Sequence, residues 1–185
     1  FKTTASMNFG SAVHEVLLED NTDNILTLPE LNLRTKAGRE ERDLIIKKNK
    51  NKIVITQKEN DDIQKILNNY RKHNLALKLL SELNEKEISY YGKIDSIPVR
   101  VRPDGIKLND YIIDIKTCQD ASPKGFRTAV YKYAYHLPST FSPVAHQNPK
   151  LYAVCITSFS DILLLPFNLW KSIAAFNEDC LIICF

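Results

Sequence analysis

The run Tyr111–Thr117 constrains the fold of this chain more than any other segment. Its sequence, Tyr-Ile-Ile-Asp-Ile-Lys-Thr, is rich in β-branched residues, which predicts a mostly buried strand. Side chains alternate between the two faces of a strand, so Asp114 and Lys116 project from the same face, about 7 Å apart along it. Charged groups occupy a buried strand only when they are paired or bind a metal. We therefore expect a functional site on this strand.

Asp104 follows a predicted strand over residues 99–102 and converges on Asp114 if the two strands pair. On the earlier strand Val99 and Val101 face one side, and the polar side chains, Asp104 among them, face the other. The Asp-x-Lys triplet alone is a weak signal, because exposed strands carry such ion pairs by chance. Two acids and a lysine gathered at one sheet edge nevertheless predict a site for a hard divalent cation and a phosphate, as in a metal-dependent nuclease.

The residue types at this site favour Mg²⁺, with Mn²⁺ as the other candidate, since both take oxygen ligands. Two carboxylates and a backbone carbonyl suffice, and the carbonyl of Ile115 lies between the two motif residues. The metal is expected to polarise a phosphate oxygen and to acidify the attacking water. Lys116 is best assigned as a cation that positions the attacking hydroxide and stabilises the transition state, because the nearby aspartates oppose the loss of its proton.

Two further features are ambiguous from their chemistry alone. His14 lies in a predicted amphipathic helix over residues 9–18, beside small residues that permit close packing, and fits either a metal ligand or a structural histidine. Arg34, Lys36 and Arg39 form a basic cluster before another predicted helix. Such a cluster is usually a solvated surface, and its functional interpretation is a contact to a DNA backbone.

The wider pattern predicts a single α/β domain over the 185 residues, with a helical N-terminal part at 1–84 and a core at 85–185. Helices are expected over residues 9–18, 40–48, 56–72, 75–83 and 123–137 and from residue 169 onward, and strands over 88–91, 99–102, 111–117, 151–157 and 162–165. Residues 21–38 and 138–149 are expected to be irregular, the second stretch because of its prolines.

Composition excludes several classes of protein. With 44% hydrophobic residues, 25% charged residues and a formal net charge of +3, the chain is ordinary for a globular protein and is no polybasic nucleic-acid coat. No apolar run is long enough to span a bilayer, so no membrane partner is expected. The four cysteines, Cys118, Cys155, Cys180 and Cys184, show no Cys-x-x-Cys pairing, which favours buried or free thiols in a reducing cytosol. A start at Phe1 suggests a fragment of a longer protein.

Six short blocks follow one another in an informative order. They are Met-Asn-Phe-Gly-Ser-Ala-Val-His-Glu at 7–15, Leu-Arg-Thr-Lys-Ala-Gly-Arg-Glu at 33–40, Glu-Ile-Ser at 87–89, Arg-Pro-Asp at 102–104, Asp-Ile-Lys-Thr at 114–117 and Asp-Ala-Ser at 120–122. In this order they resemble the RecE-type exonucleases (exonuclease VIII), a branch of the PD-(D/E)XK nuclease superfamily found in phages and prophages. The resemblance covers residues 7–137.

The resemblance implies a PD-(D/E)XK restriction-endonuclease-like core, a central mixed sheet flanked by helices, with N-terminal helical additions. Together with the carbonyl inferred above, it implies a metal held by His14, Asp104, Asp114 and Ile115. Lys116 would be the catalytic lysine, and Glu87 would support the ligands without binding the metal itself. The basic loop with Arg34, Lys36 and Arg39 would contact DNA.

The same resemblance implies a Mg²⁺-dependent 5′→3′ exonuclease that acts on double-stranded DNA ends and leaves 3′ single-stranded overhangs for recombination by strand annealing. Members of the family assemble into rings around DNA, so a homo-oligomer such as a tetramer and a single-strand annealing protein are implied as partners. The implied location is the cytoplasm of a bacterial or phage-infected cell.

One position departs from the family pattern. After the catalytic lysine the family helix carries Tyr-x-x-Gln, whereas here Tyr135 is followed three residues later by Pro138, which ends the predicted helix. An alternative function is therefore a catalytically weakened DNA-end-binding or protein-interaction module that retains the nuclease fold. The presence of all four metal-site residues favours the active enzyme. A restriction-type endonuclease is a third hypothesis, ranked lower because no base-reading element is visible.

Overall fold

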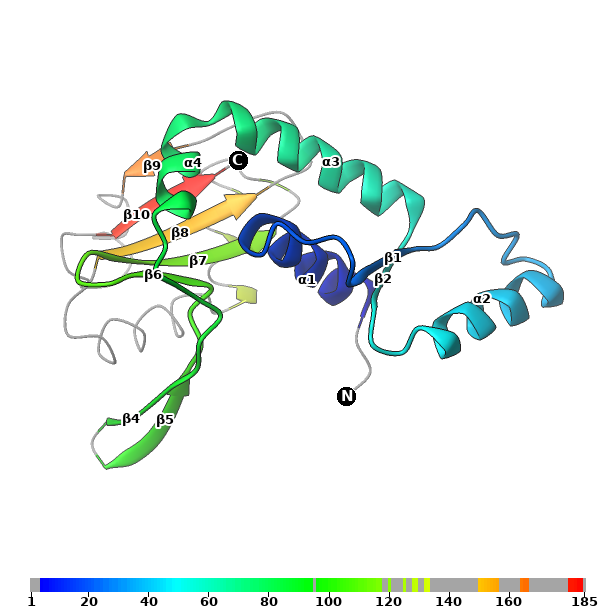
Figure 1. Ribbon diagram of the computed structural model, residues 1–185, viewed down its shortest axis with the longest axis horizontal. Helices are drawn as coiled ribbons and strands as arrows, with labels where there is room; N and C mark the ends of the chain where they lie inside the picture. Colours follow the sequence, from blue (N-terminus) through cyan, green and yellow to red (C-terminus); the bar gives the residue numbers. More distant parts are fainter. Residues whose placement is uncertain are drawn as a thin grey trace. The chain divides into compact units, whose positions relative to one another are not determined.

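The computed structural model describes residues 4–94, 96–117, 120, 125, 128–129, 132–133, 150–156, 164–166 and 180–184, which fall into two compact units, Phe1–Leu67 and Asn68–Phe185. The first unit contains α1 (Ala5–Leu18), β1 (Ile25–Thr27), α2 (Lys36–Lys48), β2 (Ile53–Ile55) and most of α3 (Gln57–Lys72), as labelled in Figure 1. The second contains the end of α3, α4 (Asn74–Ser81), β3 (Glu85–Lys86), β4 (Tyr90–Ile94), β5 (Ile97–Val101), β6 (Gly105–Lys107), β7 (Tyr111–Thr117), β8 (Lys150–Ile156), β9 (Leu164–Pro166) and β10 (Cys180–Cys184).

In the first unit, helix α1 packs on a short parallel ribbon made of β1 and β2. The side-chain amide of Asn8 on α1 donates a hydrogen bond to the carbonyl of Val54 on β2, at 3.1 Å. Apolar side chains from α1, β2 and α3 are buried in this unit, namely Val13, Val16, Leu17, Leu18, Ile55, Ile63 and Ile66. The helix expected over residues 9–18 is thus present but begins earlier, because the Thr4 hydroxyl caps it by accepting from the Met7 amide.

Helix α2 begins at Lys36 rather than at residue 40. The expectation of irregular structure over 21–38 was therefore wrong for residues 36–38, which are helical, and for residues 25–27, which form β1. The cause of the early start is a local cap. The hydroxyl of Thr35 accepts a hydrogen bond from the Gly38 amide at 3.1 Å and donates one to the carbonyl of Asn32 at 2.8 Å. The first of these bonds satisfies a free amide of the first turn, and the second orients the hydroxyl that accepts it.

Gly38 is buried against the backbone of this cap. Its replacement by alanine is expected to lower the free energy of unfolding by about 1–2 kcal/mol, because the cost of crowding exceeds the gain from the higher helix propensity of alanine. A Cβ atom there would lie 2.3 Å from the carbonyl oxygen of Asn32. The matched control is Gly92→Ala, whose Cβ would meet only Val99, at 3.9 Å. Urea denaturation of both variants checks the prediction, and equal stability of the two would contradict it.

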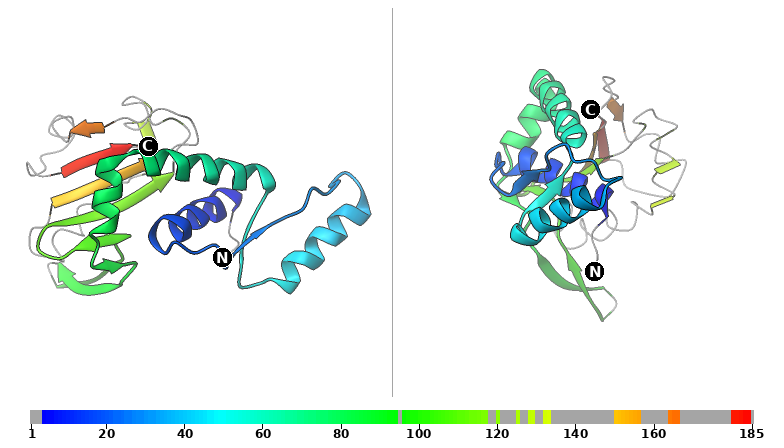
Figure 2. Two further views of the ribbon diagram at one scale, coloured as in Figure 1. Left: turned by 45° about the horizontal axis from the view of Figure 1, so that its top comes forward. Right: turned by 90° about the vertical axis from the view of Figure 1, so that its right-hand side faces the viewer.

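The second unit contains a six-stranded mixed sheet with strand order β3-β6-β7-β8-β10-β9. β7 runs parallel to β8, and β8 parallel to β10, whereas the remaining neighbours are antiparallel. The left-hand view of Figure 2 shows β7, β8 and β10 lying side by side. A mixed sheet in an α/β fold agrees with the prediction from the sequence.

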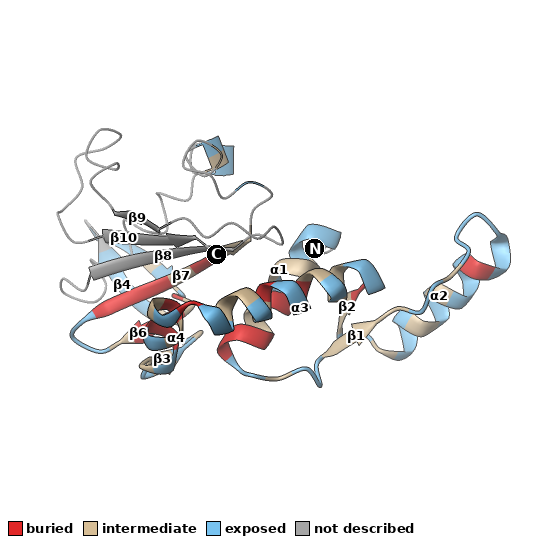
Figure 3. Ribbon diagram, turned by 90° about the horizontal axis from the view of Figure 1, so that it is seen from above, coloured by how far each residue is buried: buried red, intermediate tan, exposed pale blue. Residues whose placement is uncertain are grey.

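Strand β7 lies inside this sheet and matches the predicted strand residue for residue. Ile112 and Ile113 are completely buried and Ile115 is almost so, which Figure 3 shows as a red strand. Helix α4 is tied to the same strand, because the hydroxyl of Tyr111 donates to the carbonyl of Leu79 at 2.7 Å. The two charged side chains of β7 therefore project from a rigid and largely apolar support.

The last part of the chain departs from the prediction. Residues 180–184 form strand β10, parallel to β8, where a helix was expected from residue 169 onward. Of the helix expected over 123–137, the described residues, Gly125, Thr128, Ala129, Lys132 and Tyr133, are helical, and the others lie outside the described part of the chain, as do residues 138–149 with Pro138. No helix in the described part is long and apolar enough to cross a membrane.

Candidate metal centre

Asp104 lies directly before β6, the antiparallel neighbour of β7. Its Oδ2 accepts a hydrogen bond from the backbone N–H of Ile115 at 2.5 Å, so its carboxylate lies against β7. The strand expected over 99–102, just before Asp104, was predicted as the neighbour of β7, and this pairing was wrong. β5 pairs with β4 in a separate two-stranded sheet, and Pro103, which has no N–H to donate, separates β5 from β6.

Asp114 and Lys116 project from the same face of β7, as the strand period predicted. The Nζ of Lys116 lies 2.6 Å from Oδ1 of Asp114 and 3.5 Å from the carbonyl oxygen of Ile115. The two side chains are only partly exposed, 18% for Asp114 and 24% for Lys116. Limited exposure strengthens their attraction and so holds the ammonium group beside the carboxylate.

Glu87 and Asp104 face each other across a hairpin whose register is unbroken. Glu87 follows β3 directly and Asp104 precedes β6 directly, and the next ladder outward begins at Tyr90 opposite Val101. Three residues on each strand separate the two ladders, so the same register places Glu87 opposite Asp104. The N–H of Glu87 donates to the carbonyl of Asp104 at 3.1 Å, and oxygens of the two carboxylates lie within 4.8 Å of each other.

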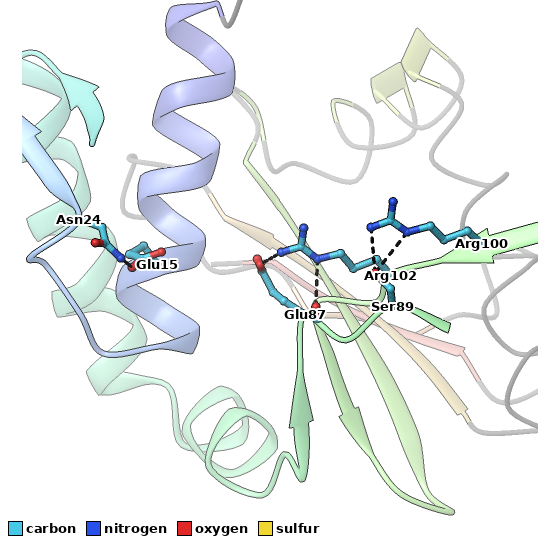
Figure 4. Close-up of polar contacts among 6 residues, drawn as sticks. All are labelled: Glu15, Asn24, Glu87, Ser89, Arg100 and Arg102. Carbon is cyan, nitrogen blue, oxygen red and sulfur yellow. Dashed lines mark hydrogen bonds and ion pairs between the residues drawn. The ribbon is translucent and has the colours of Figure 1, made fainter. Parts of the chain in front are cut away.

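The backbone of Glu87 adopts an unusual conformation at this point. Its φ of 51° lies in the left-handed region, which residues other than glycine seldom adopt and which is often found at functional sites. Arg102 holds the residue in place. Its Nε donates to the Glu87 carbonyl at 3.0 Å and its Nη2 to the Glu87 carboxylate, as Figure 4 shows. The first bond holds the backbone of Glu87, and the second fixes the direction of its carboxylate.

Glu87 belongs to the candidate site together with Asp104, whereas the sequence predicted for it only a supporting role behind the ligands. The informative signal is the equal spacing of the hairpin strands on either side of the turn, which brings residue 87 opposite residue 104. Asp114, predicted as a ligand, does not join these two carboxylates within the same 4.8 Å limit. Its closest described partner is the ammonium group of Lys116.

The donor set fits a hard divalent cation. Carboxylate oxygens are the ligands that Mg²⁺ and Mn²⁺ prefer. Two carboxylates that face each other at this separation repel, and a cation between Glu87 and Asp104 would replace that repulsion with attraction. The guanidinium of Arg102 forms an ion pair with the Glu87 carboxylate, so one positive charge already lies beside the two carboxylates.

The remaining predicted site residues lie in the first unit, whereas the carboxylates lie in the second; they are His14, Arg34, Lys36 and Arg39. His14 is half-buried in the middle of α1. The three basic residues are exposed around the start of α2, where Lys36 lies 3.7 Å from Glu40. Their exposure is compatible with a phosphate contact and equally with a solvated surface.

The chain is similar to a family of domains and to a solved structure. A family described as "PDDEXK-like domain of unknown function (DUF3799)" matches residues 2–141. No curated protein matches the chain. Among solved structures, the chain is similar to a crystal structure of a protein named "Putative exonuclease" from Eubacterium rectale, with 7% sequence identity and a TM-score of 0.48. That match covers 86% of this chain and 57% of the other, so the chain spans little more than half of that protein.

Proposed function

The chain belongs to the PDDEXK-like domain family, and on this basis we propose that it is a Mg²⁺-dependent nuclease acting on double-stranded DNA. The observation that carries the proposal is the facing pair of carboxylates, Glu87 and Asp104, next to the Asp114–Lys116 ion pair on β7. In its finer form the proposal is a 5′→3′ exonuclease that leaves 3′ single-stranded overhangs, which is what the resemblance to RecE-type enzymes implies.

Each residue has a proposed role in phosphodiester hydrolysis. The ligands would be Glu87, Asp104, Asp114 and the Ile115 carbonyl, with His14 added because of the family resemblance alone. A bound divalent cation supplies a polarised phosphate oxygen and a more acidic water. Lys116, held 2.6 Å from Asp114, would keep its proton and place a positive charge beside the phosphate oxygens as they gain negative charge. Arg102 would position Glu87.

The partners follow from the same proposal. DNA ends would be the substrate, and Arg34, Lys36 and Arg39 would contact the phosphate backbone without reading sequence. A ring-shaped homo-oligomer, such as a tetramer, would keep the enzyme on its substrate, and a single-strand annealing protein would receive the overhang. These partners, and the cytoplasm of a bacterial or phage-infected cell as the location, rest on the resemblance.

The test is hydrolysis of linear duplex DNA labelled at either the 5′ or the 3′ end, with closed circular duplex beside it. We expect label to leave the 5′ end first, only with Mg²⁺ or Mn²⁺, while the circle stays intact. Absence of metal-dependent release from the linear substrate would overturn the proposal. Cutting of the circle would replace the exonuclease with an endonuclease.

A second candidate function is a DNA-end-binding or protein-interaction module with weakened catalysis. The observation that favours it is Pro138, which stands where the family pattern expects a glutamine. Such a protein would bind linear DNA with an affinity that falls as salt rises and would release no nucleotides with either metal. The labelled substrates above separate the two functions when binding and hydrolysis are measured on the same preparation.

A further inference from the structure

The β4–β5 hairpin presents different side chains on its two faces. Tyr91 lies opposite Arg100, and Lys93 opposite Pro98, so these four side chains share one face. The other face is apolar at its base, where Tyr90 packs against the buried pair Ile106 and Ile112 and where Val99 and Val101 are half-buried. Figure 1 shows the hairpin projecting from the six-stranded sheet. At the base of the hairpin the apolar face is therefore partly covered, whereas Tyr91, Lys93, Pro98 and Arg100 on the polar face are exposed.

Side chains on the polar face form a continuous series from the candidate metal centre toward the tip. Arg102 contacts Glu87 at the base, and Arg100 donates to the hydroxyl of Ser89 at 2.9 Å, as Figure 4 shows. The guanidinium carbon of Arg100 lies 5.9 Å from the centroid of the Tyr91 ring, which is a cation–π contact. We call the set Lys93, Tyr91, Arg100 and Arg102 the hairpin strip.

The hairpin strip is both cationic and aromatic. Tyr91 is 77% exposed, although burying an aromatic ring of this size would stabilise the folded protein. Residues 88–102 contain three cations and a single acid, Asp95. A phosphodiester strand is complementary to this charge, and its bases supply flat partners for the ring. Proteins that bind single strands combine these two features, a positive track and an aromatic side chain on which a base stacks.

We propose that the hairpin strip binds an unpaired DNA strand beside the metal centre, with one base stacked on Tyr91 and the adjoining phosphates against Arg100 and Lys93. This inference rests on the proposed nuclease function, since it names the part of the substrate held next to the same site. Tyr91 is four residues from Glu87, at most about 13 Å along a strand, so the bound nucleotides lie close to the bond that is cut. A base inside a duplex is stacked on both faces and offers none to Tyr91, which favours an unpaired strand over the interior of a duplex.

The first experiment measures binding of the full chain to fluorescein-labelled oligothymidylate and to a blunt duplex, with EDTA present to prevent hydrolysis. We expect Tyr91→Ala and Arg100→Ala to weaken binding of the single strand at least about fivefold, with a much smaller effect of Tyr91→Ala on the duplex. The matched control is Ile97→Ala, because Ile97 is 65% exposed but lies on the opposite face. Unchanged single-strand affinity of Tyr91→Ala, or an equal loss on both substrates, would overturn the inference.

The second experiment reports stacking directly and does not depend on an alanine variant folding normally. In Tyr91→Trp the new indole should be quenched when oligothymidylate binds, because a base stacks on it. In Ile97→Trp, on the opposite face of the same hairpin, the emission should stay unchanged against the common background of Trp170. Equal quenching of the two variants, or none in either, would contradict stacking on residue 91.

Failure of this inference differs from failure of the proposed function. If wild-type protein hydrolyses linear DNA while both tryptophan variants behave alike, the hairpin strip is excluded and the nuclease stands. If wild-type protein binds the single strand through Tyr91 but hydrolyses nothing with Mg²⁺ or Mn²⁺, the nuclease is excluded and the strip stands as a single-strand binding site.

Discussion

Replacing Asp104 with asparagine is expected to reduce metal-dependent hydrolysis of linear DNA by more than about 100-fold. The amide oxygen of the new side chain would still accept the hydrogen bond from the Ile115 N–H, so the packing of β6 against β7 should survive. What disappears is one of two facing negative charges that would attract the cation. Release of acid-soluble nucleotides measures the effect on hydrolysis, and calorimetric titration with Mn²⁺ measures the effect on metal affinity.

The matched control for this variant is Asp110→Asn, which makes the same chemical change in the exposed turn between β6 and β7. It should hydrolyse DNA and bind Mn²⁺ as the wild type does. Wild-type hydrolysis by Asp104→Asn would exclude Asp104 as a ligand and with it the metal centre described above. A loss in both variants would instead indicate damage to the β6–β7 pair.

Replacing Lys116 with methionine is expected to lower the rate of hydrolysis by about 100-fold to 1,000-fold while leaving Mn²⁺ affinity unchanged or slightly tighter. The ammonium group contacts Asp114 but is not itself a metal ligand. Its removal therefore takes away the positive charge beside the phosphate and leaves the ligands of the metal in place. Single-turnover hydrolysis at saturating Mn²⁺ isolates this effect from any change in metal binding.

Lys107→Met is the control for this second variant, since Lys107 is also half-buried and lies on the adjacent strand β6. Arginine at position 116 should restore little activity, because a planar guanidinium directs its charge differently from an ammonium group. A Lys116→Met protein that loses Mn²⁺ binding would show that the lysine supports the ligands, and one with wild-type rate would remove it from the chemistry.

Strand β7 was predictable because its information is local. A run of isoleucines interrupted by Asp114 and Lys116 indicates a buried strand with a charged face, and both features are present. The resemblance rests on the order of several such blocks, and its PD-(D/E)XK part is confirmed by the family match. The assignment to the RecE-type branch stays a prediction, as do the roles of His14 and the basic loop.

The pairing of strands was harder to predict, because it depends on partners distant in the sequence. The short strand β6 carries only three residues, too few for a periodic signal, so the neighbour of β7 was misassigned to residues 99–102. The prediction of a helix over the residues of β10 was wrong for a related reason. Cys180 and Cys184 are spaced as on one face of a helix, whereas the apolar residues between them pair in parallel with β8.

Because the register between residues 85 and 106 is unbroken, the candidate metal centre should tolerate equal changes in length of the two hairpin strands but not a change in one strand alone. Removing the same number of residues from β4 and β5 at the turn keeps Glu87 opposite Asp104. An insertion of one residue in a single arm, between the turn and the centre, displaces one carboxylate by a full step and reverses its face. Relatives of this chain can thus differ widely in how far this arm reaches, provided that its two sides lengthen together.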